Sequence, residues 1–139
     1  MKTQKISHNK TAVTRNWHTI DGSSTTVGRV ATQVANLLRG KHKRTFSPHI
    51  DMGDYVIVTN VDKLKFSGRK VAQKVYYRHS GYLGGLKEEK LEQLIQSKPE
   101  EVLKRAVFSM LDEVKFRKTM MSRLKLIKGT EHKYSQVTK

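Results

Sequence analysis

The stretch Gly53-Asp54-Tyr55-Val56-Ile57-Val58 places four large nonpolar residues in a row directly after a turn. An unbroken run of this kind is typical of a strand that is buried on both faces, as in the interior of a parallel sheet. An amphipathic surface strand would alternate polar and nonpolar residues instead. We therefore predict a central parallel strand here, and the flanking sequence must supply the elements that cover it.

On the N-terminal side, residues 16–20 alternate and predict a short strand, and Asp21-Gly22-Ser23-Ser24 predicts a turn. Ser24 or Thr25 is suited to cap a helix that runs to about Arg39. Gly40 then stands where a left-handed terminating residue is wanted. The nonpolar residues of this helix recur at intervals of three and four, which places them on one face: Val27, Val30, Ala31, Val34, Leu37 and Leu38.

On the C-terminal side the pattern predicts more helices and one closing strand. The expected elements are an extended piece at 64–66, a basic and aromatic helix within 69–79, a break at 81–85, helices over 87–97 and from Pro99, a basic helix over 115–123 and a strand at 124–127. This order is typical of an α/β fold. We expect three layers, α/β/α, around a small and mainly parallel sheet.

The charge balance implies a polyanionic partner. The 139 residues include 28 Lys and Arg but only 12 Asp and Glu, which gives a formal net charge of +16 and a pI near 10.2. A small domain usually carries a net charge of about 2–8 in magnitude. RNA, DNA or an anionic membrane face would each relieve the self-repulsion of so basic a chain.

The same composition bounds the organisation of the chain. It has no cysteine, which excludes disulfides and thiolate metal sites and fits a reducing compartment. We find neither an apolar run that would span a bilayer nor a secretory signal. We expect a basic arm at residues 1–14, a single domain over residues 15–139 and a polar tail in the last dozen residues.

Three segments are candidates for nucleic-acid contact, and the densest follows the first predicted helix. Four permanent cations stand within six residues there, which exceeds what the capping of a helix C-terminus requires. Cations on a loop can each neutralise a phosphate. The candidates are Arg39, Lys41, His42, Lys43 and Arg44, together with His49 further along the same loop.

The second segment interleaves aromatic and basic residues over positions 74–85. Rings that stack on unpaired bases and cations that hold the backbone are typical of surfaces that bind irregular RNA. Gly81, Gly84 and Gly85 would let backbone amides approach phosphates. One of the two adjacent tyrosines is expected to face inward. The candidates are Lys74, Tyr76, Tyr77, Arg78, His79 and Tyr82.

The third segment is the basic helix predicted over residues 115–123. Phe116, Met120 and Leu124 share its inward face at helical spacing. Lys115, Lys118 and Arg123 are then expected to face outward. The acids cluster elsewhere, which suggests a side that faces away from RNA: Glu88, Glu89, Glu92, Glu100 and Glu101.

The sequence gives little support for a catalytic site. A metal-dependent nuclease using His49, Asp51 and Asp54 is the enzyme alternative, with His42 as a further candidate, but their spacing matches no metal motif. Asp51 and Asp54 are better explained by hydrogen bonds at a turn and at a strand entry. The small polar turn at 22–29 lacks the P-loop and dinucleotide patterns, so we expect no nucleotide cofactor, although an RNA phosphate could bind at that helix N-terminus.

Many motifs in order resemble one known family. They are Asn16-Trp17, Val27-Gly28-Arg29-Val30-Ala31, Leu38-Arg39-Gly40-Lys41-His42-Lys43, Pro48-His49-Ile50-Asp51-Met52-Gly53-Asp54-Tyr55-Val56-Ile57-Val58, Gly68, Lys74-Val75-Tyr76-Tyr77-Arg78-His79-Ser80-Gly81-Tyr82-Leu83-Gly84-Gly85 and Pro99-Glu100. Across nearly its whole length the chain is similar to the bacterial-type large-subunit ribosomal protein thirteen family. The family usually has a Pro- and Gly-rich loop where residues 112–117 stand, so a helix could extend there.

The resemblance implies a three-layer α/β fold and a structural role without catalysis or cofactor. That role is to bind large-subunit ribosomal RNA, beside neighbouring ribosomal proteins, and to support early subunit assembly and translation. It implies RNA contact by Arg39, by residues 41–44 and by the loop from Tyr76 to Gly85. It also implies a place in a cytoplasmic or organellar ribosome, with no membrane, small-molecule substrate or homo-oligomer. A regulatory RNA-binding protein acting off the ribosome remains the main alternative.

Overall fold

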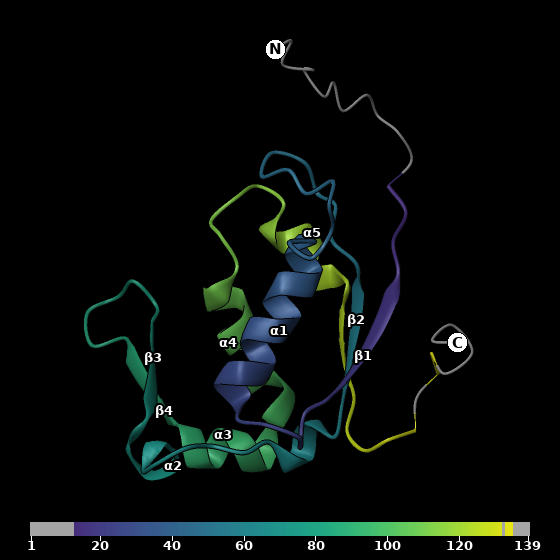
Figure 1. The fold of residues 1–139 in the computed structure, drawn as a ribbon. Coiled ribbons are helices and arrows are strands. Elements are labelled where there is room, and N and C mark those ends of the chain that lie inside the picture. The colour runs from purple at the N-terminus through teal and green to yellow at the C-terminus, as the bar shows by residue number, and fades with distance from the viewer. Residues whose placement is uncertain (1–12, 132, 135–139) are drawn as a thin grey trace, which may run out of the picture.

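The computed structural model describes residues 13–131 and 133–134, and its centre is a parallel sheet of three strands (Figure 1). The strands are β1 (Trp17–Asp21), β2 (Tyr55–Thr59) and β5 (Leu124–Leu126), in the order β1-β2-β5. Both pairings are parallel, with Trp17 opposite Tyr55 and Val56 opposite Leu124. The nonpolar run at 55–58 is therefore the middle strand, which confirms the prediction from its sequence.

The main core lies between this sheet and two long helices. These are α1 (Val27–Arg39) and α4 (Pro99–Met110), which pack against each other. Val56 and Val58 of β2 point into this core and are fully buried. The short helix α5 (Arg117–Ser122) adds Met120 at one end. The α/β class with a mainly parallel sheet is thus confirmed.

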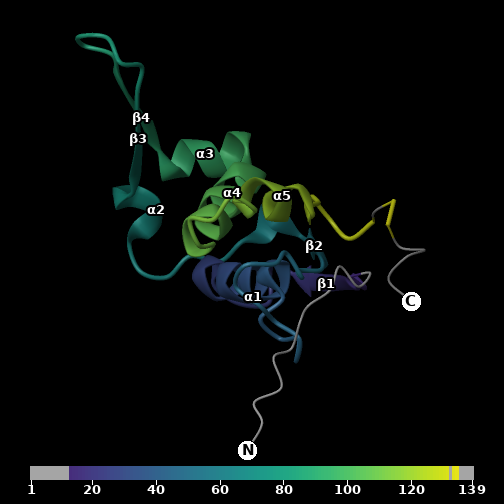
Figure 2. The same cartoon turned by 90° about the horizontal axis from the view of Figure 1, so that it is seen from above.

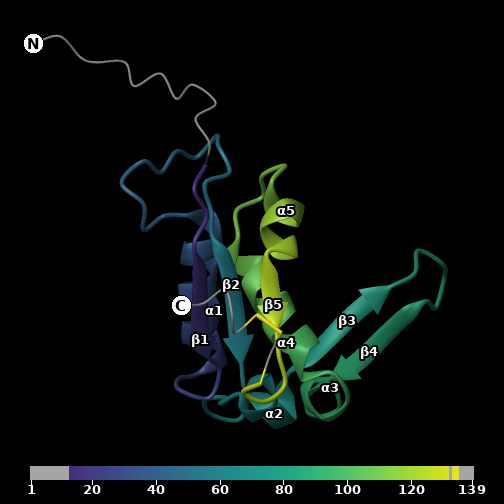
Figure 3. The same cartoon turned by 90° about the vertical axis from the view of Figure 1, so that its right-hand side faces the viewer.

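The other face of the sheet is covered differently. Side chains alternate along a strand, so Trp17, Tyr55 and Ile57 point away from the helical core. Figure 3 shows α1 and α4 behind the sheet, with the C-terminal segment crossing in front. Tyr134 of that segment stacks on Trp17, which in turn stacks on Tyr55. Within the described residues, this second flank is therefore covered by irregular chain where we had expected a helical layer.

After β2 comes the 3₁₀ turn η1 (Val61–Lys63), whose Val61 is buried in the main core. Residues 67–97 then form a lateral extension. It contains α2 (Lys70–Gln73), the antiparallel hairpin of β3 (Val75–His79) and β4 (Leu86–Lys90), and α3 (Leu91–Ser97). Seen from above, the hairpin stands away from the helices (Figure 2). Leu91, Leu94 and Val102 make a small second core at its base.

The hairpin corrects two predictions. The helix expected within 69–79 is only one turn long and then gives way to β3, and the helix expected over 87–97 begins four residues later, at Leu91. The helical spacing is confirmed for Leu91, Leu94 and Ile95, but these residues belong to α3 and the helix does not extend back to residue 87. Residues 86–90 are mostly exposed on both faces of β4, so no buried stripe marks them as a strand.

Other local predictions mostly hold. Gly40 ends α1 in the left-handed conformation with φ of 80°, and Pro99 begins α4 with Glu100 and Glu101 in its first turn. The start of α1 is later than expected, because Thr26 is the extended residue before the helix. Residues 112–116 form a loop between α4 and α5, so the possible helical extension there was wrong. Most of the predicted basic arm lies outside the described residues.

Candidate nucleic-acid interface

The basic loop that follows α1 presents its charges at one end of the molecule. Lys41, His42 and Arg44 are exposed, whereas Lys43 is only partly so. Gly40 turns the chain out of the helix here, and an added Cβ would come within 2.8 Å of the Met52 carbonyl oxygen. The tight turn therefore brings the loop against residues 52–54, which lead into β2.

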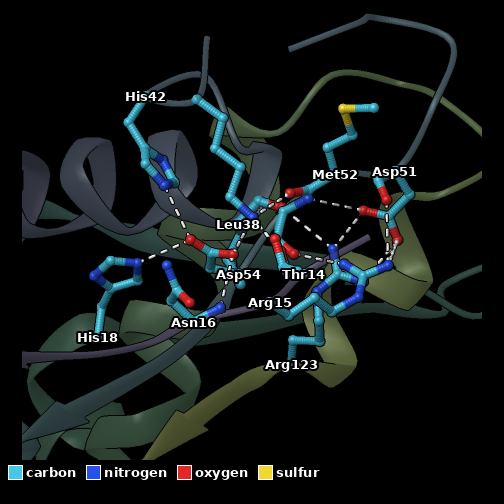
Figure 4. A network of polar contacts seen from close by, with 12 residues as sticks. Thr14, Arg15, Asn16, His18, Leu38, His42, Asp51, Met52, Asp54 and Arg123 are labelled. Atoms are coloured by element: carbon cyan, nitrogen blue, oxygen red, sulfur yellow. Dashed lines mark hydrogen bonds and ion pairs between the residues drawn. The ribbon is translucent and has the colours of Figure 1, made fainter. Parts of the chain in front are cut away.

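The buried carboxylate of Asp54 holds this loop in place (Figure 4). Asp54 is 0% exposed. Its Oδ2 atom lies 2.9 Å from Nε2 of His42 and 2.9 Å from Nε2 of His18. Its Oδ1 atom accepts hydrogen bonds from the Lys43 ammonium and from the backbone N–H of Asn16. One acid thus connects β1, the basic loop and the entry to β2.

These contacts decide the ionisation of Asp54. Burial by itself would raise the pKa of the carboxyl group, because it penalises the charged form. The hydrogen bonds from Lys43, His18 and the Asn16 amide outweigh burial and lower the pKa of Asp54 to about 2. The carboxylate is therefore ionised at neutral pH, and Lys43 serves partly as its counter-ion.

A second acid, Asp51, whose side chain is 12% exposed, pairs with Arg123. Asp51 accepts hydrogen bonds of 2.6 Å from both terminal nitrogens of the Arg123 guanidinium. Arg123 is only 4% exposed and also donates to the Leu38 carbonyl oxygen. The prediction that Arg123 faces outward is therefore wrong, and its charge is used to join α5 to the loop before β2.

The third segment lies beside the basic loop. Arg39 forms an ion pair with Asp112, and its guanidinium lies 5.4 Å from the Phe46 ring centroid. This joins the 112–116 loop to the end of α1. Lys115 and Lys118 are exposed as predicted. The structure thus brings the first and third basic segments together at one end of the fold.

The nuclease constellation is not assembled. Both oxygens of Asp51 are held by Arg123, and His49 contacts the Ser47 hydroxyl at 2.8 Å. Asp51 also accepts a turn hydrogen bond from the Gly53 amide, and Asp54, at the entry to β2, accepts one from the Asn16 amide on the neighbouring segment. The observed contacts thus support structural roles for both acids, at a turn and at a strand entry.

The second segment is the β3–β4 hairpin, which projects sideways from near the end of the fold opposite the basic loop (Figure 1). Tyr76 faces inward, with Arg105 at 4.8 Å and Lys74 at 5.0 Å from its ring centroid. Tyr77 and Tyr82 point outward and are 65% and 80% exposed. Arg78 and His79 are exposed as well. One tyrosine inside and the other outside is the expected arrangement.

The hairpin tip is open around two of its glycines. Gly81 and Gly84 have φ values of 90° and 70°, and a Cβ added to either would meet no heavy atom of the described chain within 4 Å. Left-handed backbone favours glycine, and the open space leaves the backbone accessible. By contrast, Gly85 packs closely on Ser80.

Several acids are neutralised at the base of the hairpin. Arg105 of α4 pairs with Glu89 at 3.4 Å and with Glu101 at 3.2 Å, and Lys128 lies 3.9 Å from Glu100. The acidic region therefore carries internal ion pairs, whereas Lys41 and Arg44 are exposed cations at the opposite end. The charge asymmetry seen in the sequence is preserved in space.

Sequence reasoning missed two residues of the loop anchor. Arg15 donates to the Asp51 carbonyl oxygen at 3.2 Å and to that of Gly53. His18 reaches Asp54 from the neighbouring strand. The parallel pairing of the first two strands was itself predictable, and it places residue 18 beside the residues that open β2. Aligning the first two strands residue by residue would therefore have shown that His18 lies close to Asp54.

The fold and this surface define a small, strongly basic α/β domain with charge concentrated on loops. Its sequence matches the family model described as Ribosomal protein L13 over residues 15–133. The chain belongs to the ribosomal protein L13 family. Among described residues, no helix is both long and apolar enough to cross a membrane.

The chain is also similar in sequence to bacterial proteins over most of their length. The chain is 49% identical to the large ribosomal subunit protein uL13 of Nitratidesulfovibrio vulgaris over 123 residues, which cover 88% of this chain and 85% of the relative. It is also 49% identical to uL13 of Geobacter sp. (strain M21) over 135 residues, or 97% and 94% of the two chains. The uL13 of Psychrobacter sp. (strain PRwf-1) gives the same identity and coverage.

Proposed function

We propose that this protein is a structural component of the large ribosomal subunit that binds large-subunit ribosomal RNA and supports early subunit assembly and translation. The observation that carries the proposal is the exposed basic loop, whose cations project from an anchor on buried Asp54, in a chain of a ribosomal protein family. The family is one of structural proteins and not of enzymes.

In this proposal two surfaces contact the RNA. At one end, Lys41, His42 and Arg44 contact phosphates, with Arg39, Lys43, His49, Lys115 and Lys118 beside them. Each exposed cation there releases counterions when it meets a phosphate. At the other end, Tyr77 and Tyr82 stack on unpaired bases while Lys74, Arg78 and His79 hold the backbone. Tyr76 supports the hairpin from within.

The proposal extends to organisation and location. Residues 15–139 act as one RNA-binding domain, and residues 1–14 are a basic N-terminal arm. The protein works as a single copy in the ribosome, beside neighbouring ribosomal proteins and without a cofactor or small-molecule substrate. Its bacterial relatives support a cytoplasmic ribosome of the bacterial type.

The salt dependence of RNA binding tests the basic loop. Lys41→Ala/Arg44→Ala removes two exposed cations and leaves Lys43 on Asp54. We expect the slope of log K against log salt for full-length large-subunit ribosomal RNA to fall by about 1.5, since each phosphate contact contributes about 0.7–0.9. Lys98→Ala/Lys104→Ala is the matched control, because both residues are exposed near the acidic region. An unchanged slope in the first variant, or an equal drop in the control, would contradict the assignment.

Sedimentation of the tagged protein in a lysate tests the ribosomal role itself. Co-migration with the large subunit that survives high salt is expected of an integral component. Migration as free protein or with other RNAs would instead favour a regulatory RNA-binding protein acting off the ribosome. The two experiments are independent, because a different contact surface would change only the first.

A further inference from the structure

The cluster of His18, His42 and Asp54 has the composition of a metal site. The two imidazole Nε2 atoms both face the same carboxylate oxygen, each at 2.9 Å from Oδ2 of Asp54. All three potential ligand atoms lie within 4.8 Å of one another. Zn²⁺ binds imidazole nitrogen and carboxylate oxygen at about 2.0–2.2 Å, so small ring rotations bring the three atoms around one ion.

The side chains come from three different parts of the fold. His18 lies on β1, His42 on the loop that Gly40 turns out of α1, and Asp54 at the entry to β2. The two rings are edge to face, with centroids 5.5 Å apart. The side chains of both histidines are about one third exposed, whereas that of Asp54 is fully buried. An ion can therefore enter from solvent and reach a fixed carboxylate.

The surroundings of Asp54 resemble the outer shell of a metal ligand. Carboxylates that bind a metal are usually held in place by hydrogen bonds from neighbouring groups. Here Oδ1 is held by Lys43 and by the Asn16 amide, which leaves Oδ2 to the histidines. Lys43 also donates to the carbonyl oxygens of Thr14 and Met52. Its ammonium is thereby fixed on the Oδ1 side and does not block the position between the rings.

We propose that His18 Nε2, His42 Nε2 and Asp54 Oδ2 bind one Zn²⁺ ion. Two neutral histidines and a carboxylate are a known zinc ligand set with a fourth position left for water. Each ring binds through Nε2 and carries its proton on Nδ1. The ion joins β1, the basic loop and β2 at the point where the loop leaves the fold, and so stiffens the loop. This site goes beyond the proposed RNA binding and does not depend on it.

Zinc titration of the full-length protein, freed of metal by a chelator, tests the site. We expect one Zn²⁺ per chain in competition with a chromophoric chelator. Co²⁺ as a substitute should give the strong visible absorption of a low-coordinate ion. His18→Gln and His42→Gln keep the size of a polar side chain at part-exposed positions. Each should weaken binding at least about tenfold, as even changes to outer-shell partners cost about 10–100-fold.

The control removes the same number of histidines from elsewhere. His49→Gln/His79→Gln should bind Zn²⁺ as tightly as the unchanged protein, because neither residue is in the cluster. Added Zn²⁺ should raise the melting temperature of this control but not of His18→Gln/His42→Gln, since a ligand that binds the folded state stabilises it. Absence of stoichiometric binding, or binding retained in His18→Gln/His42→Gln, would overturn the proposal. Circular dichroism of each variant verifies that it is folded.

Discussion

One fully buried carboxylate, Asp54, and one largely covered carboxylate, Asp51, organise the basic end of this protein. In a chain of net charge +16, Asp51 and Asp54 are the acids around which Arg15, Lys43 and Arg123 gather. A buried charge without a partner is costly, so each acid and its cations must fold together. The cations used in this way are not free for phosphates. Some of the basic residues therefore hold the loops in place by pairing with these acids, and others are exposed to solvent.

The two aspartates that pair with arginine allow a matched comparison. Asp51→Asn leaves the buried Arg123 charge without its counter-ion and should lower the free energy of unfolding by about 3 kcal/mol, in the range for broken buried pairs. Asp112→Asn makes the same change in a pair whose side chains are 32% and 47% exposed, so its cost should stay below about 1 kcal/mol. Urea unfolding of both variants measures the difference. Equal losses would mean that burial does not distinguish the two pairs.

Acid should weaken the Asp54 anchor over a defined range. The folded pKa of about 2 lies below the ordinary value of 3.8. A depressed pKa stabilises the folded state above the unfolded value, and that contribution is lost as pH falls from about 4 toward 2. Lowering the pKa of Asp54 by nearly two units corresponds to about 2 kcal/mol of folding stability. In metal-free protein, the stability gap between the unchanged chain and Asp54→Asn should therefore shrink by about 1.5 kcal/mol between pH 6 and pH 2.5, because the last part is lost only below the folded pKa.

The matching measurement is urea unfolding at several pH values in the presence of a chelator. Asp54→Asn has no titrating group at this position, so it reports all other effects of acid on the fold. A gap that stays constant with pH would show that the Asp54 carboxylate has the same pKa in the folded and unfolded chain.

At the scale of elements, burial explains which predictions succeeded. Tyr55 to Val58 form a strand covered on both sides, and their composition alone indicates that. The stripes of α1 and α4 repeat at helical spacing because each helix has one buried face. The β3–β4 hairpin extends into solvent, so neither of its strands carries a buried stripe that the sequence could reveal. Likewise, the Asp51–Arg123 pair joins residues 72 positions apart, and no local pattern encodes it.

In the hairpin, we expect the exposed Tyr77 and Tyr82 to contribute to RNA binding and the inward-facing Tyr76 to contribute to folding stability. Tyr77→Ala and Tyr82→Ala change exposed rings, so each should alter folding stability by less than about 0.5 kcal/mol. Each should weaken binding to large-subunit ribosomal RNA by about 1–3 kcal/mol, the usual cost of losing a base–aromatic stack. Filter binding with the folded variants measures this.

Tyr76→Ala serves as the contrasting variant. Tyr76 packs on the second core and lies beneath Arg105, so its loss should cost about 2 kcal/mol of stability, less than a fully buried ring. If Tyr77→Ala lowers stability and leaves RNA affinity unchanged, the outward ring has a structural role and the hairpin assignment fails.

At the scale of the whole molecule, the charge is divided along the long axis. The basic loop and the 112–116 loop lie at one end, and the β3–β4 hairpin projects sideways from near the other (Figure 1). Internal ion pairs at Arg105 hold acids between them. A partner that meets both ends must be large and folded. This geometry suits a ribosomal RNA better than a short single strand, which would follow one continuous groove.

The C-terminal segment closes the sheet on its second face, and the single tryptophan reports on that closure. Trp17 stacks on Tyr55 with centroids 4.4 Å apart and on Tyr134 with centroids 5.5 Å apart. Tyr134→Ala should expose one face of the indole, shift its fluorescence to longer wavelength and reduce stability by about 1 kcal/mol, near the value of an aromatic pair. Tyr82→Ala removes a tyrosine from the hairpin and should leave the spectrum unchanged. If Tyr134→Ala also leaves the spectrum unchanged, the C-terminal segment does not cover Trp17 in solution.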